Sequence, residues 1–298
     1  MATAAAGLLL LALSVPSSAA PALRALPLPA FSHQAAAHPS DASFPSTERT
    51  FGDSVDPLDS LTVAGEDLRD AVAAVPSPAA LQTGLRSPAV LTRLSAIRAA
   101  AYPRDVQAVP YLSAVMLRYD EVSQVRAAAA LALGRINDRV AVAALAEGLK
   151  DPSPEVRYAA ALSLGRLPAD GVATRLGRAL QKDPSWQVRY AACIALGRTR
   201  KAFVAEDLAA ALTGDSAWQV RQQAARSLQD IGTPRAAEAL SQALLDPEPS
   251  VRAAAGSALA EIGGPAQRRA VAEALRVEAD PSVRAVLRVA SRRSLSRP

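Results

Sequence analysis

Apolar residues in one stretch of the chain recur at the spacing of an amphipathic helix. Val156, Ala160, Leu164 and Leu167 follow one another at intervals of four, four and three residues, which places them on a single helix face. The preceding stretch, 140–149, is also apolar along one side. The pattern therefore predicts two consecutive helices, each with one face to bury.

Proline and polar residues mark where these two helices meet. Asp151-Pro152 follows the first stretch, and the residue before a proline disfavours helical geometry. Ser153 suits the N-cap of the second helix, and Pro154 suits its first position, where the missing N–H costs nothing. Residues 140 to about 167 are thus predicted to form a helical hairpin.

The hairpin pattern repeats. A Val-Arg pair recurs six times, and successive arginines of these pairs lie 31 or 32 residues apart. The pairs are Val125-Arg126, Val156-Arg157, Val188-Arg189, Val220-Arg221, Val251-Arg252 and Val283-Arg284. An aspartate lies six residues before five of the arginines, an alanine three residues after five of them, and a leucine seven residues after five. This register through successive copies indicates internal structural repeats.

One hairpin of this length cannot bury its apolar face alone, so stacked copies must share a continuous core. The sequence predicts an all-α fold, an α-solenoid of about six repeats of 31–32 residues over residues 88–290. An incomplete copy at Leu94–Arg98 opens the array. Abundant Ala and Leu favour helices, and the aromatic content of 4% argues against a β-sandwich or barrel.

The residues that carry the repeat resemble a known family. DPSPEVRYAAALSLG (residues 151–165) is similar to the HEAT-like repeat of the phycobilisome-lyase type, and the other copies match it across about two thirds of the chain. The resemblance implies a curved α-solenoid. It leaves the function open, since such repeats serve as scaffolds, chromophore lyases, a di-iron hydroxylase and DNA glycosylases.

The resemblance also implies a role for the charged columns. In HEAT-like families they form a structural ladder in which each arginine bonds acids of its own and adjacent repeats, and the planar guanidinium suits that task. The ladder residues expected here are Asp120, Arg126, Asp151, Asp183, Asp215, Asp246 and Arg252.

Aromatic residues break the pattern in two adjacent copies. Trp186 and Trp218 lie two residues before the repeated valine, where the other copies have serine or proline, and Tyr158 and Tyr190 follow the repeated arginine. All four lie off the core stripe, on the first turn of the second helix. We hypothesise a binding patch made by these rings together with Arg157, Arg189 and Arg221, because Trp, Tyr and Arg are enriched in binding hot spots. The alternative is that the rings only cover the loops between repeats.

A second basic column lies nine residues beyond the repeated arginines. It holds Arg135, Arg166 and Arg198, and Asp230 and Glu261 replace it in the next two copies. Either this is an anion-binding stripe that becomes acidic towards the C-terminus, or the cations are solvated and favour the negative helix end. Cys193 occupies an alanine column and is interpreted as a small packing residue.

Composition excludes several kinds of site. One cysteine cannot build a disulfide framework or a Cys-based zinc site. Both histidines, His33 and His38, lie in a Pro/Ala-rich stretch, so no His-based metal or acid–base site is expected in the repeats. A di-iron hydroxylase of the deoxyhypusine type requires His-Glu pairs within the repeats and is excluded. No metal and no cofactor are expected.

The rest of the chain divides by composition and charge. Residues 1–20 are interpreted as a signal peptide or targeting leader, with an apolar run too short to span a bilayer. Residues 21–87 are a Pro/Ala/Ser-rich linker with one helix predicted at 61–74. Residues 91–298 hold 29 basic and 20 acidic side chains, a net charge of +9, and the chain ends in a basic tail, 291–298.

These features favour a non-catalytic scaffold that binds a protein or peptide on the concave face of the solenoid. The leader predicts export to the periplasm or the extracellular space, with a plastid or cytoplasmic location as the alternative. Two other functions stay open, a phycobilin-lyase-like chromophore chaperone and a nucleic-acid-binding HEAT-like protein. Nucleic acid is disfavoured because acids interleave with the arginine columns. The sequence carries no strong signal for an oligomer or for a membrane span in the mature chain.

Overall fold

The computed structural model describes residues 77–295, which form fourteen α-helices and two short 3-10 helices and contain no strand. The helices alternate between two layers. The first layer consists of α1 (Pro78–Leu85), α3 (Val109–Met116), α5 (Ala141–Gly148), α7 (Val172–Lys182), α9 (Ala205–Gly214), α11 (Pro234–Ala243) and α13 (Pro265–Val277). The second layer consists of α2 (Val90–Ala101), α4 (Ser123–Ile136), α6 (Pro154–Leu164), α8 (Trp186–Thr199), α10 (Trp218–Ile231), α12 (Pro249–Ile262) and α14 (Pro281–Leu295).

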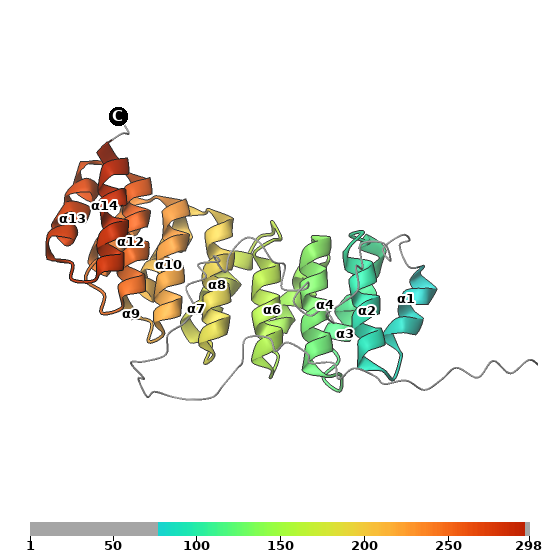
Figure 1. Cartoon of the computed structure of the whole chain (residues 1–298). Coiled ribbons are helices and arrows are strands. Elements are labelled where there is room, and N and C mark those ends of the chain that lie inside the picture. Colours follow the sequence, from blue (N-terminus) through green and yellow to red (C-terminus); the bar gives the residue numbers. More distant parts are fainter. Residues whose placement is uncertain (1–76, 296–298) are drawn as a thin grey trace, which may run out of the picture. The chain divides into compact units, whose positions relative to one another are not determined.

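Each hairpin packs against the next one along the chain. Second-layer helices contact their nearest second-layer neighbours, α4 with α6 and α6 with α8, and first-layer helices do the same. Figure 1 shows the even-numbered helices side by side in chain order. The 3-10 helices η1 (Val106–Ala108) and η2 (Ala202–Val204) lead into α3 and α9. The prediction of an all-α solenoid is confirmed.

The predicted apolar columns form the core of this array. The repeated valines from Val125 to Val251 are fully buried, and so are the alanines from Ala129 to Ala255 and the leucines from Leu133 to Leu259. Each column contributes one side chain per repeat between the two layers, so burial is shared along the whole stack and no single hairpin needs to be stable alone.

Some helix boundaries follow the expected chemistry. Ser153 is the N-cap of α6 with Pro154 at the first position, although the Ser153 hydroxyl donates to the Glu155 carboxylate and makes no cap bond to the backbone. Asn137 and Gly232 end α4 and α10 in the left-handed conformation, which asparagine and glycine adopt at low cost.

Three glycines near the ends of second-layer helices have another role. Gly134, Gly165 and Gly197 are not among the residues with positive φ, so no left-handed turn requires glycine there. A Cβ at Gly165 would instead lie 2.6 Å from the Cα of Ala195 on the neighbouring helix. These glycines therefore allow close contact between successive second-layer helices.

The described residues extend beyond the predicted repeat boundaries at both ends. The first helix begins at Pro78 and not after residue 88, and it packs on α2. The last helix continues to Leu295, into the segment assigned to a basic tail. The leader and the helix expected at 61–74 lie outside the described residues. Within 77–295, no helix has both the length and the apolar character needed to cross a bilayer.

Candidate functional site

A chain of ion pairs joins each repeat to the next at the start of the second-layer helices. In each of five rungs a guanidinium donates from Nε and Nη2 to both oxygens of one carboxylate of the following repeat, at 2.7–3.0 Å. The rungs are Arg126–Asp151, Arg157–Asp183, Arg189–Asp215, Arg221–Asp246 and Arg252–Glu278. We call this set the ladder.

Each rung also uses its remaining hydrogen-bonding groups. The Nη1 of Arg189 donates to the carbonyl of Asp183 at 2.9 Å, in its own repeat. The Asp215 carboxylate that receives Arg189 also accepts the backbone N–H of Ala217 at 2.9 Å, just before α10. The ladder thus fixes the loop before each second-layer helix from α6 to α14. Arg189 donates to Asp215 and Arg221 donates to Asp246, and these hydrogen bonds raise the pKa of both guanidinium groups.

The first repeat differs from the expected ladder. Asp120 is exposed and lies 3.5 Å from Arg118, while the neighbouring Glu121 is buried and accepts from Arg93 at 2.9 Å. Glu121 lies one residue nearer to the start of the helix than the acid of the other copies, and its longer side chain takes the role that aspartate has there. The carbonyl of Glu121 accepts from Arg126.

Glu278 is a second ladder residue that aspartate-based reasoning missed. It lies six residues before Arg284, in the same column as the aspartates, and it accepts both bonds from Arg252. The Arg252 guanidinium holds the pKa of Glu278 below its usual value. Allowing either acid in the column would have found it.

Three arginines that the sequence grouped with the aromatic patch are ladder residues. The side chains of Arg157, Arg189 and Arg221 are 12–14% exposed, and each binds a carboxylate and a backbone carbonyl. Their guanidinium groups are committed within the protein, so the exposed part of the patch consists of the aromatic rings alone.

The solvent-facing side of the second-layer helices, which we call the inner surface, carries these rings. Trp186 and Trp218 are the first residues of α8 and α10, and they are 37% and 39% exposed. Tyr190 lies one turn after Trp186 on the same face of α8, and Tyr158 has the equivalent position on α6. The four rings occupy corresponding positions on three neighbouring helices.

The two tyrosines are less accessible than the tryptophans. Burial, with a smaller contribution from neighbouring Tyr190, raises the pKa of Tyr158 to about 12. Burial is also the main cause of the raised pKa of Tyr190. Both phenols are neutral at physiological pH.

The second basic column lies at the far end of the same helices. The guanidinium carbon of Arg135 is 4.2 Å from the centre of the Tyr102 ring, a cation–π contact between α4 and the end of α2. Arg166 and Arg198 line a hollow of about 480 Å³ between the α6–α7 loop and the end of α8. Asp230 is exposed, and Glu261 lines a separate hollow. We call the hollow lined by Arg166 and Arg198 the loop hollow. Its lining residues are Asn137, Gly165, Arg166, Leu167, Pro168, Ala169, Asp170, Val172, Ala173, Arg198, Thr199 and Lys201.

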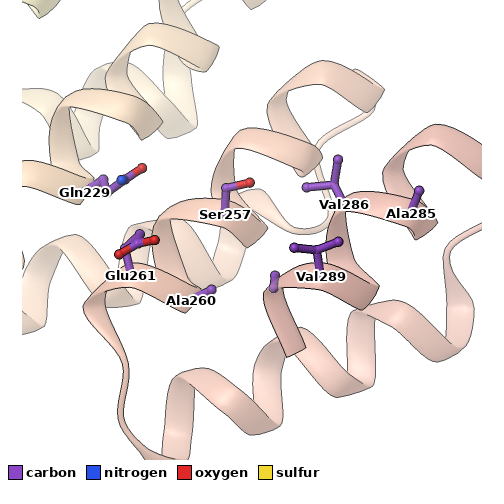
Figure 2. Close-up of a pocket in the computed structure, with 8 residues that line it drawn as sticks. Gln229, Ser257, Ala260, Glu261, Ala285, Val286 and Val289 are labelled. Carbon is purple, nitrogen blue, oxygen red and sulfur yellow. The ribbon is translucent and has the colours of Figure 1, made fainter. Parts of the chain in front are cut away.

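The second hollow, of about 370 Å³, opens between the last three second-layer helices. Figure 2 shows Gln229 of α10, Ser257 and Glu261 of α12, and Val286 and Val289 of α14 around it. Its walls are mostly apolar.

Cys193 lies inside the array. Its side chain is fully buried, and its Sγ is 4.0 Å from the carbonyl oxygen of Val220. Desolvation raises the pKa of the thiol, so the thiolate is disfavoured at physiological pH. Among the described residues, no group of three or more His, Cys, Asp or Glu side chains is placed to hold a metal ion.

The chain is similar in fold to several solved structures. The X-ray structure of the Escherichia coli protein YibA has a TM-score of 0.51 and 18% identity, with 78% of this chain and 98% of that chain covered. The complex of CpcE and CpcF of the phycocyanin lyase from a Nostoc species has a TM-score of 0.46, 23% identity, and coverage of 73% and 94%. Human deoxyhypusine hydroxylase has a TM-score of 0.39, 24% identity, and coverage of 74% and 84%.

No curated protein matches the chain. A family model of HEAT repeats matches it at residues 78–152, 142–213 and 205–291, which together span almost all of the described array. The repeat register, the two helical layers and this match agree, and the chain belongs to the HEAT repeat family.

Proposed function

We propose that this protein is a non-catalytic scaffold that binds a segment of a partner protein on the inner surface, over α6, α8 and α10. The observation that carries the proposal is the exposure of two tryptophans at equivalent positions of adjacent repeats. Exposing two large indole rings costs free energy that other copies avoid by having serine or proline there. A partner that covers them recovers this cost.

The surroundings of the tryptophans support a protein partner. Trp and Tyr are enriched among the residues that dominate binding energy, since they bury large areas while losing little conformational entropy. Tyr158 and Tyr190 are half-buried and add aromatic surface on α6 and α8. The neighbouring ladder arginines are held in place, so the rings stand on helices with fixed spacing and little ordering cost accompanies binding.

Capture from native lysate tests the proposal. The full chain, Trp186→Ala/Trp218→Ala, and a control with Phe203→Ala/Leu245→Ala would be immobilised in parallel. The control removes two exposed apolar side chains outside the inner surface. A protein retained by the wild type and the control and lost from the tryptophan variant supports the proposal. Equal retention by the tryptophan variant contradicts it, as does recovery of nucleic acid or pigment in place of protein.

Intrinsic fluorescence gives a direct second measurement, because Trp186 and Trp218 are the only tryptophans in the chain. A partner that covers them should shift their emission to shorter wavelength and protect them from a soluble quencher. Binding with unchanged emission and unchanged quenching would move the site away from these rings.

Export is part of the proposal and rests on the leader sequence. If residues 1–20 direct export, the mature protein begins near residue 20 and is recovered outside the cytoplasm. N-terminal sequencing of the protein from its native source distinguishes this from an uncleaved cytoplasmic protein.

A further inference from the structure

The last helix that the structure describes, α14, carries a row of positive charge. Arg284, Arg288 and Arg292 follow one another at intervals of four residues, so they lie on one face of the helix, and all three are exposed. The sequence of α14 contains no acid. Because like charges one turn apart destabilise a helix, a ligand with negative charge would stabilise α14. We call these three residues the arginine stripe.

The arginine stripe forms no ion pair within the part of the chain that the structure describes. The nearest acid along the chain is Asp280, whose carboxylate accepts the backbone N–H groups of Ser282 and Val283. By contrast, the exposed Arg235 on α11 donates to Glu238 one turn away, at 2.9 Å. The cations of the stripe are therefore available to carboxylates of another molecule.

The hollow of Figure 2 lies beside the arginine stripe. Ala285, Val286 and Val289 of α14 form one wall of this hollow, whose volume is about 370 Å³. Arg288 lies three residues after Ala285. Arg292 has the same relation to Val289, so each of these arginines is a neighbour of a lining residue on the helix surface. Since Val289 is 52% exposed, α14 presents an apolar wall next to a row of cations.

The opposite wall of the hollow offers no cation. It consists of Gln229 of α10 and of Ser257, Ala260 and Glu261 of α12. Figure 2 shows Ser257 and Glu261 across the hollow from Val289. Negative charge on a ligand is therefore favoured along α14 and not along α12, and the apolar side of such a ligand faces the hollow.

We propose that the hollow of Figure 2 and the arginine stripe together bind an acidic amphipathic helix of a partner protein. An apolar side chain of that helix occupies the hollow, and carboxylates at intervals of four residues meet the stripe. Four residues rise about 6 Å in any α-helix, so the two rows of charge match in spacing. The concave, mostly apolar hollow favours a protein over a bilayer or a nucleic acid, because neither presents a single projecting apolar side chain.

This site is separate from the aromatic patch. Trp218 begins α10, and Gln229 lies about 16 Å further along the same helix. The inference therefore goes beyond the proposed scaffold function and does not depend on it.

Fluorescence anisotropy of labelled peptides, titrated with the full chain at physiological ionic strength, tests the site. The peptides are about four helical turns long, with a stripe of leucine, isoleucine or phenylalanine and a row of glutamates beside it. The wild type should bind at least one of them saturably. The same peptide with glutamine in place of glutamate should bind about tenfold more weakly, since the exposed ion pairs each contribute little and act together.

Two variants separate the charged and apolar parts of the site. Arg284→Gln/Arg288→Gln/Arg292→Gln should bind the acidic peptide about tenfold more weakly and the glutamine peptide as the wild type does. Val289→Gln removes part of the apolar wall and should weaken binding of both peptides about fivefold. Circular dichroism and thermal unfolding establish that each variant is folded. If the triple variant is not, Val289→Gln and the comparison of the two peptides carry the test.

Two controls show whether binding is specific to this site. Arg175→Gln/Arg178→Gln/Lys182→Gln removes three exposed cations of α7, the same change in net charge, and should leave binding unchanged. Trp186→Ala/Trp218→Ala should also bind the peptide as the wild type does. Loss of binding in the tryptophan variant would place the peptide on the aromatic patch and contradict this proposal, with no bearing on the scaffold function.

Four other results overturn the proposal. They are no binding of any acidic peptide by the wild type, equal binding of the glutamine peptide, an equal loss of binding in the α7 control, and displacement of the peptide by a tighter polyanion. The polyanions tested are duplex DNA and vesicles of phosphatidylserine and phosphatidylcholine. If either binds more tightly than the peptide, displaces it and is lost from the triple variant, the arginine stripe belongs to a nucleic-acid or membrane surface.

Discussion

Second-layer helices pack differently in the two halves of the array. From α4 to α10, Gly134, Gly165 and Gly197 face Ser163, Ala195 and Ser227 of the next helix, and a Cβ on any of these glycines would lie within 2.9 Å of a side-chain atom there. The same repeat position holds Gln229 on α10 and Ala260 on α12. We call these two parts the glycine section, α4–α10, and the C-terminal section, α10–α14.

The two sections differ in what surrounds this position. In the glycine section the helices are close enough for the Ser163 and Ser227 hydroxyls to donate to backbone carbonyls of the preceding helix, each at 2.8 Å. In the C-terminal section Gln229 and Ala260 line the hollow of Figure 2. The same repeat position is therefore a close helix contact in the glycine section and part of a hollow in the C-terminal section.

We expect the largest loss of stability when a ladder carboxylate is removed, and we compare one such carboxylate in each section. In the glycine section Arg126 and Asp151 are almost fully buried, so Asp151→Ala leaves a buried guanidinium unpaired and should lower the free energy of unfolding by about 3–5 kcal/mol. Asp246→Ala, in a slightly more exposed rung of the C-terminal section, should cost less. Urea unfolding measures both. Asp120→Ala is the control and should change little, because that carboxylate is 80% exposed.

We expect a smaller loss of stability when a glycine at the contact between second-layer helices is replaced. A Cβ at Gly165 would lie 2.6 Å from the backbone of Ala195, which cannot rotate away, so Gly165→Ala should destabilise by about 1–3 kcal/mol. Gly214→Ala is the matched control, since no atom lies within 4 Å of its added Cβ, and it should be neutral or stabilising by up to about 1 kcal/mol. Equal costs at the two positions would mean that helix contact does not explain the glycines.

The smallest effect concerns the last rung, in the C-terminal section. Arg252 lowers the pKa of Glu278 in the folded protein, so the ionised carboxylate contributes stability that is present above its unfolded pKa of about 4.3 and lost as the pH falls through the folded value. Glu278→Gln should therefore destabilise at pH 7, and its difference from the wild type should shrink at pH 3. Urea unfolding at both pH values tests this. For the exposed Glu273→Gln the difference should be small at both pH values.

The fold could be predicted from the sequence because one period governs it. Each valine, alanine and leucine column places an apolar side chain at the same point of every hairpin, so a few positions specify the whole core. The ladder was predicted where the acid lies six residues before the repeated arginine. Glu121 escaped prediction because it lies one position after that column, next to Asp120.

Features that depend on distance between helices were harder to predict. A glycine near a helix end is compatible with a turn or with close packing, and only the position of Ala195 distinguishes the two for Gly165. Lys201 and Asp170 line the loop hollow from loops whose sequences differ between copies, so no column reveals them. Trp186 and Trp218 were identified because they interrupt a column, although their partner cannot be derived from it.

The contacts of Glu121, before the first rung of the ladder, have a consequence for the order in which the array loses structure. Glu121 is shared between Arg93 and Arg118, and the Nε of Arg93 is buried with no hydrogen-bond partner in the described part of the chain. In an array coupled only between neighbours, the weakest coupling sets where cooperativity fails first. The α1–α2 hairpin should therefore open and exchange its amide hydrogens before α4–α12, as a separate unit of local unfolding that leaves the remaining repeats folded.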